Sequence, residues 1–166
     1  MSLVSEDKPQ FSSPACAMHE ADDAYMGYAT PEELATFLNE LLEAERAGSR
    51  VTLESANEAG SGPVGDLMTT IQRDEARWCA MLLGHIVRLG GKPTAATGAF
   101  YGKAMAIAAM SERIAFLNRG QGWVVKKLRQ MLPKVRDDKL HADLEAMLQS
   151  HVANIAAAER LAAELR

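Results

Sequence analysis

Two glutamates, one glutamine and one histidine are the residues of this sequence whose types and spacing could do chemistry. Glu45, Glu75, Gln121 and His151 each interrupt a segment in which apolar residues recur at steps of three and four, the spacing of one face of an α-helix. Each falls about 10 to 15 residues into its segment, and a rise of 1.5 Å per residue then gives similar depths along four side-by-side helices. We therefore expect the four side chains to meet in one layer of a helical core.

Such a layer requires a compensating charge, because two carboxylates in an apolar interior repel each other and lose their hydration. One divalent cation bound by Glu45, Glu75 and His151 would supply it, with oxygen and nitrogen donors that suit iron, manganese or zinc. Gln121 could add a weak carbonyl ligand or a hydrogen bond to a ligand. The alternative of equal standing is a metal-free network in which Glu75 is protonated or paired with an arginine, such as Arg46 or Arg119.

Four long helices are predicted to carry this layer, because each apolar segment has helix start or stop signals. The first helix begins with Thr30 as N-cap, Pro31 at the first helical position and Glu33 completing a capping box. The other boundaries come from capping and turn residues: Pro63 to about Leu89 before Gly90, Ser111 as a cap to the residues before Pro133, and Asp137 or Asp138 onward.

The same helical faces hold two further histidines and three glycines. His85 and His141 share stripes with leucines near helix ends, so we expect buried or capping histidines with satisfied hydrogen bonds. Gly48, Gly120 and Gly122 each cost about 0.5–1 kcal/mol in a helix interior relative to alanine. Small residues there indicate either close approach of helices or room for a ligand beside the polar layer.

The order of these segments predicts an all-α fold. Residues 1–30, with Pro9 and Pro14, are expected to form an irregular N-terminal arm, and residues 31–166 a single helical domain. Short breaks after the first and third helices predict antiparallel hairpins, and the 21 residues of 90–110 are enough to cross from one end to the other. A hairpin, a long crossover and a second hairpin form one of the main topologies of the antiparallel four-helix bundle.

With these residues, the chain resembles the ferritin-like superfamily, in particular the rubrerythrin and bacterioferritin type of di-iron bundle. That family has a glutamate on each of two helices and Glu-x-x-His on the other two. Glu45 within LLEAERAG, Glu75 within DEARW and His151 match the pattern. Trp78 stands where one histidine would be, Gln121 replaces a glutamate, and Leu148 occupies another glutamate's position.

This resemblance covers residues 31–164 and implies a ferritin-like fold with a degenerate di-iron site. The departures remove the second metal and leave at most one, with Trp78 and Gln121 beside it or as weak ligands. Oxygen activation and ferroxidase chemistry are therefore not expected. Since ferritin relatives often dimerise through helix faces, the resemblance also implies a homodimer.

A second candidate site lies in the arm. Cys16 and His19 have the two-residue spacing of a metal half-site, and further ligands would have to come from His85, His141 or another subunit. The alternatives are an arm that simply packs over the helices, and a redox role for Cys16.

Composition narrows the remaining function classes. The two cysteines make no disulfide framework, and no secretory signal or membrane-length apolar run is present, so we expect a cytoplasmic location. The net charge is −4, and basic residues are not interleaved with aromatics, which argues against nucleic-acid binding. The acidic first helix is expected to lie beside a basic stretch: Glu32, Glu33, Glu40 and Glu43 beside Lys126, Lys127 and Arg129.

Two functions follow from the sequence, and neither includes an identified reaction or substrate. The first is a bundle that binds a single divalent metal or a small ligand at the layer of Glu45, Glu75, Gln121 and His151. The alternative is a metal-free bundle that acts as an interaction or oligomerisation module through the arm and the crossover.

Overall fold

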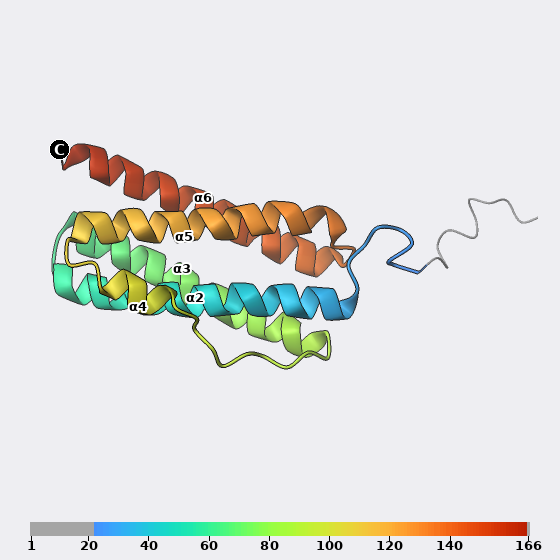
Figure 1. The fold of residues 1–166 in the computed structure, drawn as a ribbon. Coiled ribbons are helices and arrows are strands. Elements are labelled where there is room, and N and C mark those ends of the chain that lie inside the picture. The colour runs from blue at the N-terminus through green and yellow to red at the C-terminus, as the bar shows by residue number, and fades with distance from the viewer. Residues whose placement is uncertain (1–21, 166) are drawn as a thin grey trace, which may run out of the picture.

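The part of the chain that the computed structural model describes, residues 22–165, is built from helices and their connections, without a strand (Figure 1). The all-α class is confirmed for these residues. Five α-helices and one 3-10 helix follow in this order: α2 (Pro31–Ala59), α3 (Pro63–Arg88), α4 (Phe100–Met105), α5 (Met110–Met131), the 3-10 helix η2 (Leu132–Lys134) and α6 (Asp138–Glu164).

Two of the expected helix starts are confirmed by their caps. At α2, the Thr30 hydroxyl accepts from the backbone N–H of Glu33 at 3.2 Å, and the Glu33 carboxylate accepts from the backbone N–H of Thr30 at 2.8 Å. At α6, Asp137 is the N-cap and accepts from the backbone N–H of Leu140 at 2.7 Å. Side-chain capping therefore fixes the first turn of both helices.

The expected cap at Ser111 is wrong. The N-cap position of α5 is Ala109, and Ser111 lies inside the helix. A tertiary contact holds this end instead, because the buried guanidinium of Arg113 donates to the backbone carbonyl of Ile107 at 3.0 and 2.9 Å and pairs with Glu58 of α2 at 2.5 Å. A long-range ion pair has thus overridden the local capping signal.

The four long helices pack in the cyclic order α2, α3, α6 and α5, since each contacts the next around the ring. Three residues join α2 to α3, so these two helices run antiparallel as a hairpin (Figure 1). The connection between α3 and α5 contains α4, which packs against both α2 and α5. No helix in residues 22–165 is long and apolar enough to cross a membrane.

The apolar core is divided into two clusters along the helices. The first fills the end near the start of α2, and its fully buried members include Leu38, Leu41, Leu82, Leu128 and Leu144. The second fills the other end and includes Val51, Met68, Ile71, Leu117 and Ala158. On every long helix, the residue singled out from the sequence lies between these two clusters: Glu45, Glu75, Gln121 and His151.

The two remaining histidines, His85 and His141, differ in burial. His85 is buried as expected, with Nε2 2.7 Å from Asp143 and Nδ1 3.0 Å from the guanidinium of Arg88. The expectation for His141 is wrong, because this side chain is exposed. With Asp137 as the N-cap, Leu140 takes the inward position at the start of α6 and His141 turns to solvent.

The last residues before α2 dock beside η2. The backbone N–H of Ala29 donates to the carbonyl of Lys134 at 2.9 Å, and Arg136 pairs with Asp23 at 2.5 Å. On the helix surface, Lys127 pairs with Glu40 at 2.8 Å, which confirms that the acidic face of α2 lies beside the basic stretch of α5.

Candidate functional site

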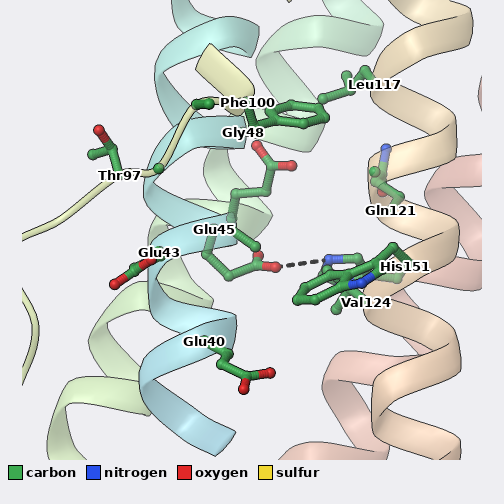
Figure 2. A pocket seen from close by; sticks show the side chains of 16 residues that line it. Glu40, Glu43, Glu45, Gly48, Thr97, Phe100, Leu117, Gln121, Val124 and His151 are labelled. Carbon is green, nitrogen blue, oxygen red and sulfur yellow. Dashed lines mark hydrogen bonds and ion pairs between the residues drawn. The ribbon is translucent and has the colours of Figure 1, made fainter. Parts of the chain in front are cut away.

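The structure brings the four polar residues together from four different helices. Glu45 of α2, Glu75 of α3, Gln121 of α5 and His151 of α6 are exposed by only 1%, 4%, 2% and 1%. All four line one cavity of ≈ 310 Å³, here called the core cavity, and Figure 2 shows Glu45 and His151 joined by a dashed line in its wall. We refer to these four residues as the polar layer.

Glu45 and His151 form a buried ion pair. Nε2 of His151 lies 3.1 Å from Oε1 of Glu45, and Nδ1 lies 3.0 Å from the backbone carbonyl oxygen of Met147. Burial by itself would lower the pKa of His151, but the charge and hydrogen bond of Glu45 outweigh it, so the pKa is raised. Both ring nitrogens face acceptors, which only the imidazolium form can satisfy with two N–H groups.

Glu75 occupies a separate position along the same face of α2, beside Gly48 and Thr52. Its Oε2 accepts from the hydroxyl of Thr52 at 3.2 Å. A Cβ at Gly48 would lie 2.5 Å from its Oε1, so the missing side chain at Gly48 provides the space for this carboxyl. Burial, and then the negative charge of Glu45, raise the pKa of Glu75 well above its usual value, which favours the protonated form.

The alternative in which Glu75 pairs with Arg46 or Arg119 is wrong. Arg46 instead donates to the backbone carbonyl of Thr94, and the guanidinium of Arg119 lies 5.3 Å from the ring centre of Phe116. Both side chains therefore stabilise surface contacts around the long connection and α5. Of the two metal-free alternatives for Glu75, the raised pKa favours the protonated carboxyl.

Three polar atoms of this layer are buried without any hydrogen-bond partner among the described residues. They are Oε2 of Glu45 and both amide atoms of Gln121, Oε1 and Nε2. In Figure 2 the Gln121 side chain leaves α5 on the side of the cavity that faces α2. A buried polar atom left unpaired costs about 1–3 kcal/mol, so such atoms are rare in native interiors and call for an explanation.

The remaining sequence candidates do not reach the core cavity. The indole N–H of Trp78 donates to the hydroxyl of Ser150 at 3.3 Å, and Trp78 belongs to the first apolar cluster. Leu148 is buried in the same cluster. Cys16 and His19 lie outside the described residues, so their expected site stays a prediction.

Residues 32–160 match a family model described as "Domain of unknown function (DUF6306)". The chain belongs to the DUF6306 family. No curated protein and no solved structure matches it. The matched range contains the whole polar layer, so the four residues and the cavity that they line are part of the DUF6306 domain itself.

As donors for a metal ion, the side chains of this domain are incompletely assembled. Within residues 22–165, no three His, Cys, Asp or Glu side chains lie close enough together to hold a metal as they stand. Glu45 and His151 are in contact, whereas Glu75 is turned toward Thr52 and the space beside Gly48. A third donor would have to come from Glu75 or from the amide oxygen of Gln121, which is buried without a hydrogen-bond partner.

The outer wall of the cavity comes from the long connection of the DUF6306 domain, and sequence reasoning missed it. Phe100 at the start of α4 fits against Gly120, where a Cβ would lie 2.7 Å from its ring. Thr94 anchors the segment before it through a hydrogen bond from its hydroxyl to Glu43 at 2.9 Å. Gly120 was the available signal for a close neighbour, but its partner is 20 positions away on another element.

Proposed function

We propose that this DUF6306 domain is a binding protein whose core cavity holds one small ligand or one divalent cation. The observation that carries the proposal is the set of unpartnered buried atoms on the cavity wall, Glu45 Oε2 and the Gln121 amide. An occupant with polar groups would satisfy them. The volume of ≈ 310 Å³ is at the lower end of the range for ligand pockets, which runs from about 300 to 1,000 Å³.

A small molecule fits this cavity better than a bare metal ion does. The volume is that of about ten waters at roughly 30 Å³ each, whereas a single cation would need donors on several sides at short range. If a divalent cation does bind, Glu45 and Nε2 of His151 would hold it, with Glu75 or Gln121 completing the set. Its positive charge would then replace the protons that balance the two carboxylates.

We propose further that the four long helices form a ferritin-like antiparallel four-helix bundle, with residues 89–109 as the crossover. The cyclic packing order and the α2–α3 hairpin support this proposal. Only one metal is compatible with it, since Trp78 and Leu148 stand in the apolar cluster where two further donors would be needed. A homodimer and a cytoplasmic location remain predictions.

Occupancy of the cavity can be tested on the purified 166-residue chain. Native mass spectrometry and metal analysis of protein prepared without chelator should detect one noncovalent ligand or one metal ion per chain. Glu45→Ala and His151→Ala should lose it, because they remove the two facing groups of the layer. Glu159→Ala and His141→Ala are matched controls with exposed side chains on α6, and both should retain it.

The opposite result would contradict the proposal. Wild-type protein that carries no adduct and takes up none of Fe(II), Mn(II), Zn(II) or small polar molecules would have an unused cavity. That result would favour the alternative in which the domain is a metal-free interaction or oligomerisation module.

A further inference from the structure

We propose that the ligand of the core cavity is a small organic cation, an ammonium or guanidinium group on a short apolar body. This inference rests on the proposed function and specifies the chemical class of the occupant. It is carried by the charge of the cavity wall, by two unpartnered acceptors and by aromatic side chains at the opening.

Most charged groups on the wall are carboxylates. Four glutamates line it, Glu40, Glu43, Glu45 and Glu75, of which Glu75 is kept neutral by its raised pKa, and its lining holds no lysine or arginine. The cationic group of His151 is already engaged by Glu45 and Met147. An anionic ligand would therefore meet carboxylates and no free cationic group, because Glu45 holds the His151 imidazolium and Glu40 holds Lys127 at the opening.

The unpartnered acceptors suit a donor-rich head group. Oε2 of Glu45 and Oε1 of Gln121 are buried and each lacks a donor. An ammonium carries three N–H donors and a guanidinium five, and neither has an acceptor. Such a group in the cavity would donate to Oε2 of Glu45 in a charge-assisted bond, and its other N–H groups would be available to Oε1 of Gln121. The Gln121 Nε2 donor would bond to an oxygen on the ligand body or to a water.

The apolar part of the wall suits a short carbon body. Phe100, Leu117 and Val124 line the cavity together with Trp123, which is 42% exposed at its opening. Aromatic faces attract cations as well as apolar groups. The chain's own Lys127 illustrates this preference at the opening, because its ammonium lies 2.8 Å from Glu40 and 5.2 Å from the Trp123 ring centre.

The inference can be tested with three probes of nearly equal shape and different charge. Benzylamine, benzyl alcohol and benzoate would each be titrated calorimetrically into the chelator-treated 166-residue chain at pH 7, and Mn(II) and Zn(II) would be titrated in parallel. We expect one benzylamine per chain, bound at least about tenfold more tightly than either isostere, because only the ammonium meets the glutamates with a complementary charge.

Variants connect this selectivity to the cavity. Glu45→Gln keeps the shape of the side chain and should weaken benzylamine binding at least about tenfold, since the charge-assisted bond is lost. Glu159→Gln, the same change at an exposed site of α6, should leave the affinity unchanged. Trp123→Leu changes a half-exposed wall residue and should weaken benzylamine without unfolding the protein. If Glu45→Gln does not fold, the comparison of the three probes and the result with Trp123→Leu still decide whether the cavity prefers an organic cation.

The outcomes separate this inference from the proposed function. Equal affinity for the three probes, or tighter binding of benzoate, would overturn the cationic class while leaving a binding cavity. One Mn(II) or Zn(II) per chain, lost in Glu45→Gln and accompanied by no benzylamine binding, would also overturn it and would favour the metal form of the proposed function. If none of the three probes binds, this inference fails, and the proposed function fails with it only if native mass spectrometry and metal analysis also detect no ligand or metal ion.

Discussion

Replacement of Glu75 by glutamine should remove a pH-dependent loss of folding stability. The buried carboxyl of Glu75 has a pKa raised well above its usual 4.5, first by burial and then by the charge of Glu45. The folded chain therefore keeps a proton on Glu75 at pH values where the unfolded chain has already released it. Glutamine has no such proton to lose and imitates the protonated carboxyl in size and polarity.

The sign and size of the effect follow from proton linkage. Where the folded state binds more protons than the unfolded state, the free energy of unfolding falls as pH rises, by up to about 1.4 kcal/mol per pH unit for one proton. The window for Glu75 opens near pH 4.5 and ends at its raised folded pKa. His151, whose pKa is also raised, stabilises fully below its unfolded value of 6.5, and this stability is lost only above it.

The range from pH 5 to pH 6 therefore isolates Glu75 from His151. With Glu75 protonated in the folded state throughout, wild-type protein should lose about 1 kcal/mol more than Glu75→Gln over this unit. Urea unfolding followed by far-ultraviolet circular dichroism at pH 5, 5.5 and 6 measures it, and Glu159→Gln is the exposed control. Parallel pH profiles for wild type and Glu75→Gln would mean that the folded protein ionises Glu75, and the electrostatic account of the layer would be refuted.

Three further predictions concern the helices that hold the layer. Gly65→Ala should destabilise the protein by about 2 kcal/mol or more, because its Cβ would lie 1.9 Å from the carbonyl oxygen of Gly60. Gly84→Ala, whose Cβ would have no atom within 4 Å, should stabilise the protein by up to about 1 kcal/mol. Urea unfolding of the two variants measures both changes. Asp137→Ala should lower the free energy of unfolding by about 1 kcal/mol through the lost cap of α6, with Asp138→Ala as the exposed control. Arg88 and the Leu140 N–H lower the pKa of Asp137 to about 2, so this contribution should persist to mildly acidic pH and disappear as pH falls from 3.8 toward 2. A difference between wild type and Asp137→Ala that does not change over this range would contradict the prediction. Burial, and then the charge of Glu45, raise the pKa of Cys79 to about 12. Iodoacetamide at pH 8 should therefore alkylate Cys79 at least about a hundredfold more slowly in folded than in urea-unfolded protein. Peptide mass spectrometry measures the two rates, and equal rates would show an accessible thiolate in the folded protein.

Local signals predicted the helices well where the structure relies on local bonds. Thr30 and Asp137 are caps because each hydrogen bond spans three residues of the same chain segment. Ser111 has the residue type of a cap but is not one, since Arg113 fixes the start of α5 through Glu58 on another helix. His141 was placed inward by a periodicity that Leu140 satisfies one residue earlier. Such errors of one or two residues arise where a tertiary contact or a neighbouring register competes with the local pattern.

The sequence likewise predicted some properties of the candidate site and not others. That Glu45, Glu75, Gln121 and His151 would be buried at one depth could be predicted, because helical periodicity and rise per residue fix the face and height of every side chain. Their partners could not be predicted from spacing. His151 pairs with Glu45, whereas Glu75 accepts a hydrogen bond from Thr52 and occupies the space beside Gly48.

What the sequence by itself determined is therefore a set of one-dimensional properties: the class of the fold, the ends of most helices and the depth of the polar layer. Only the tertiary structure decided which polar groups pair, that Phe100 closes the cavity against Gly120, and that Trp78 points elsewhere. The physical reason is that pairing depends on the rotation and separation of neighbouring helices and on the path of a long connection. Those quantities are fixed by packing among residues far apart in the chain, and no periodicity within one helix records them.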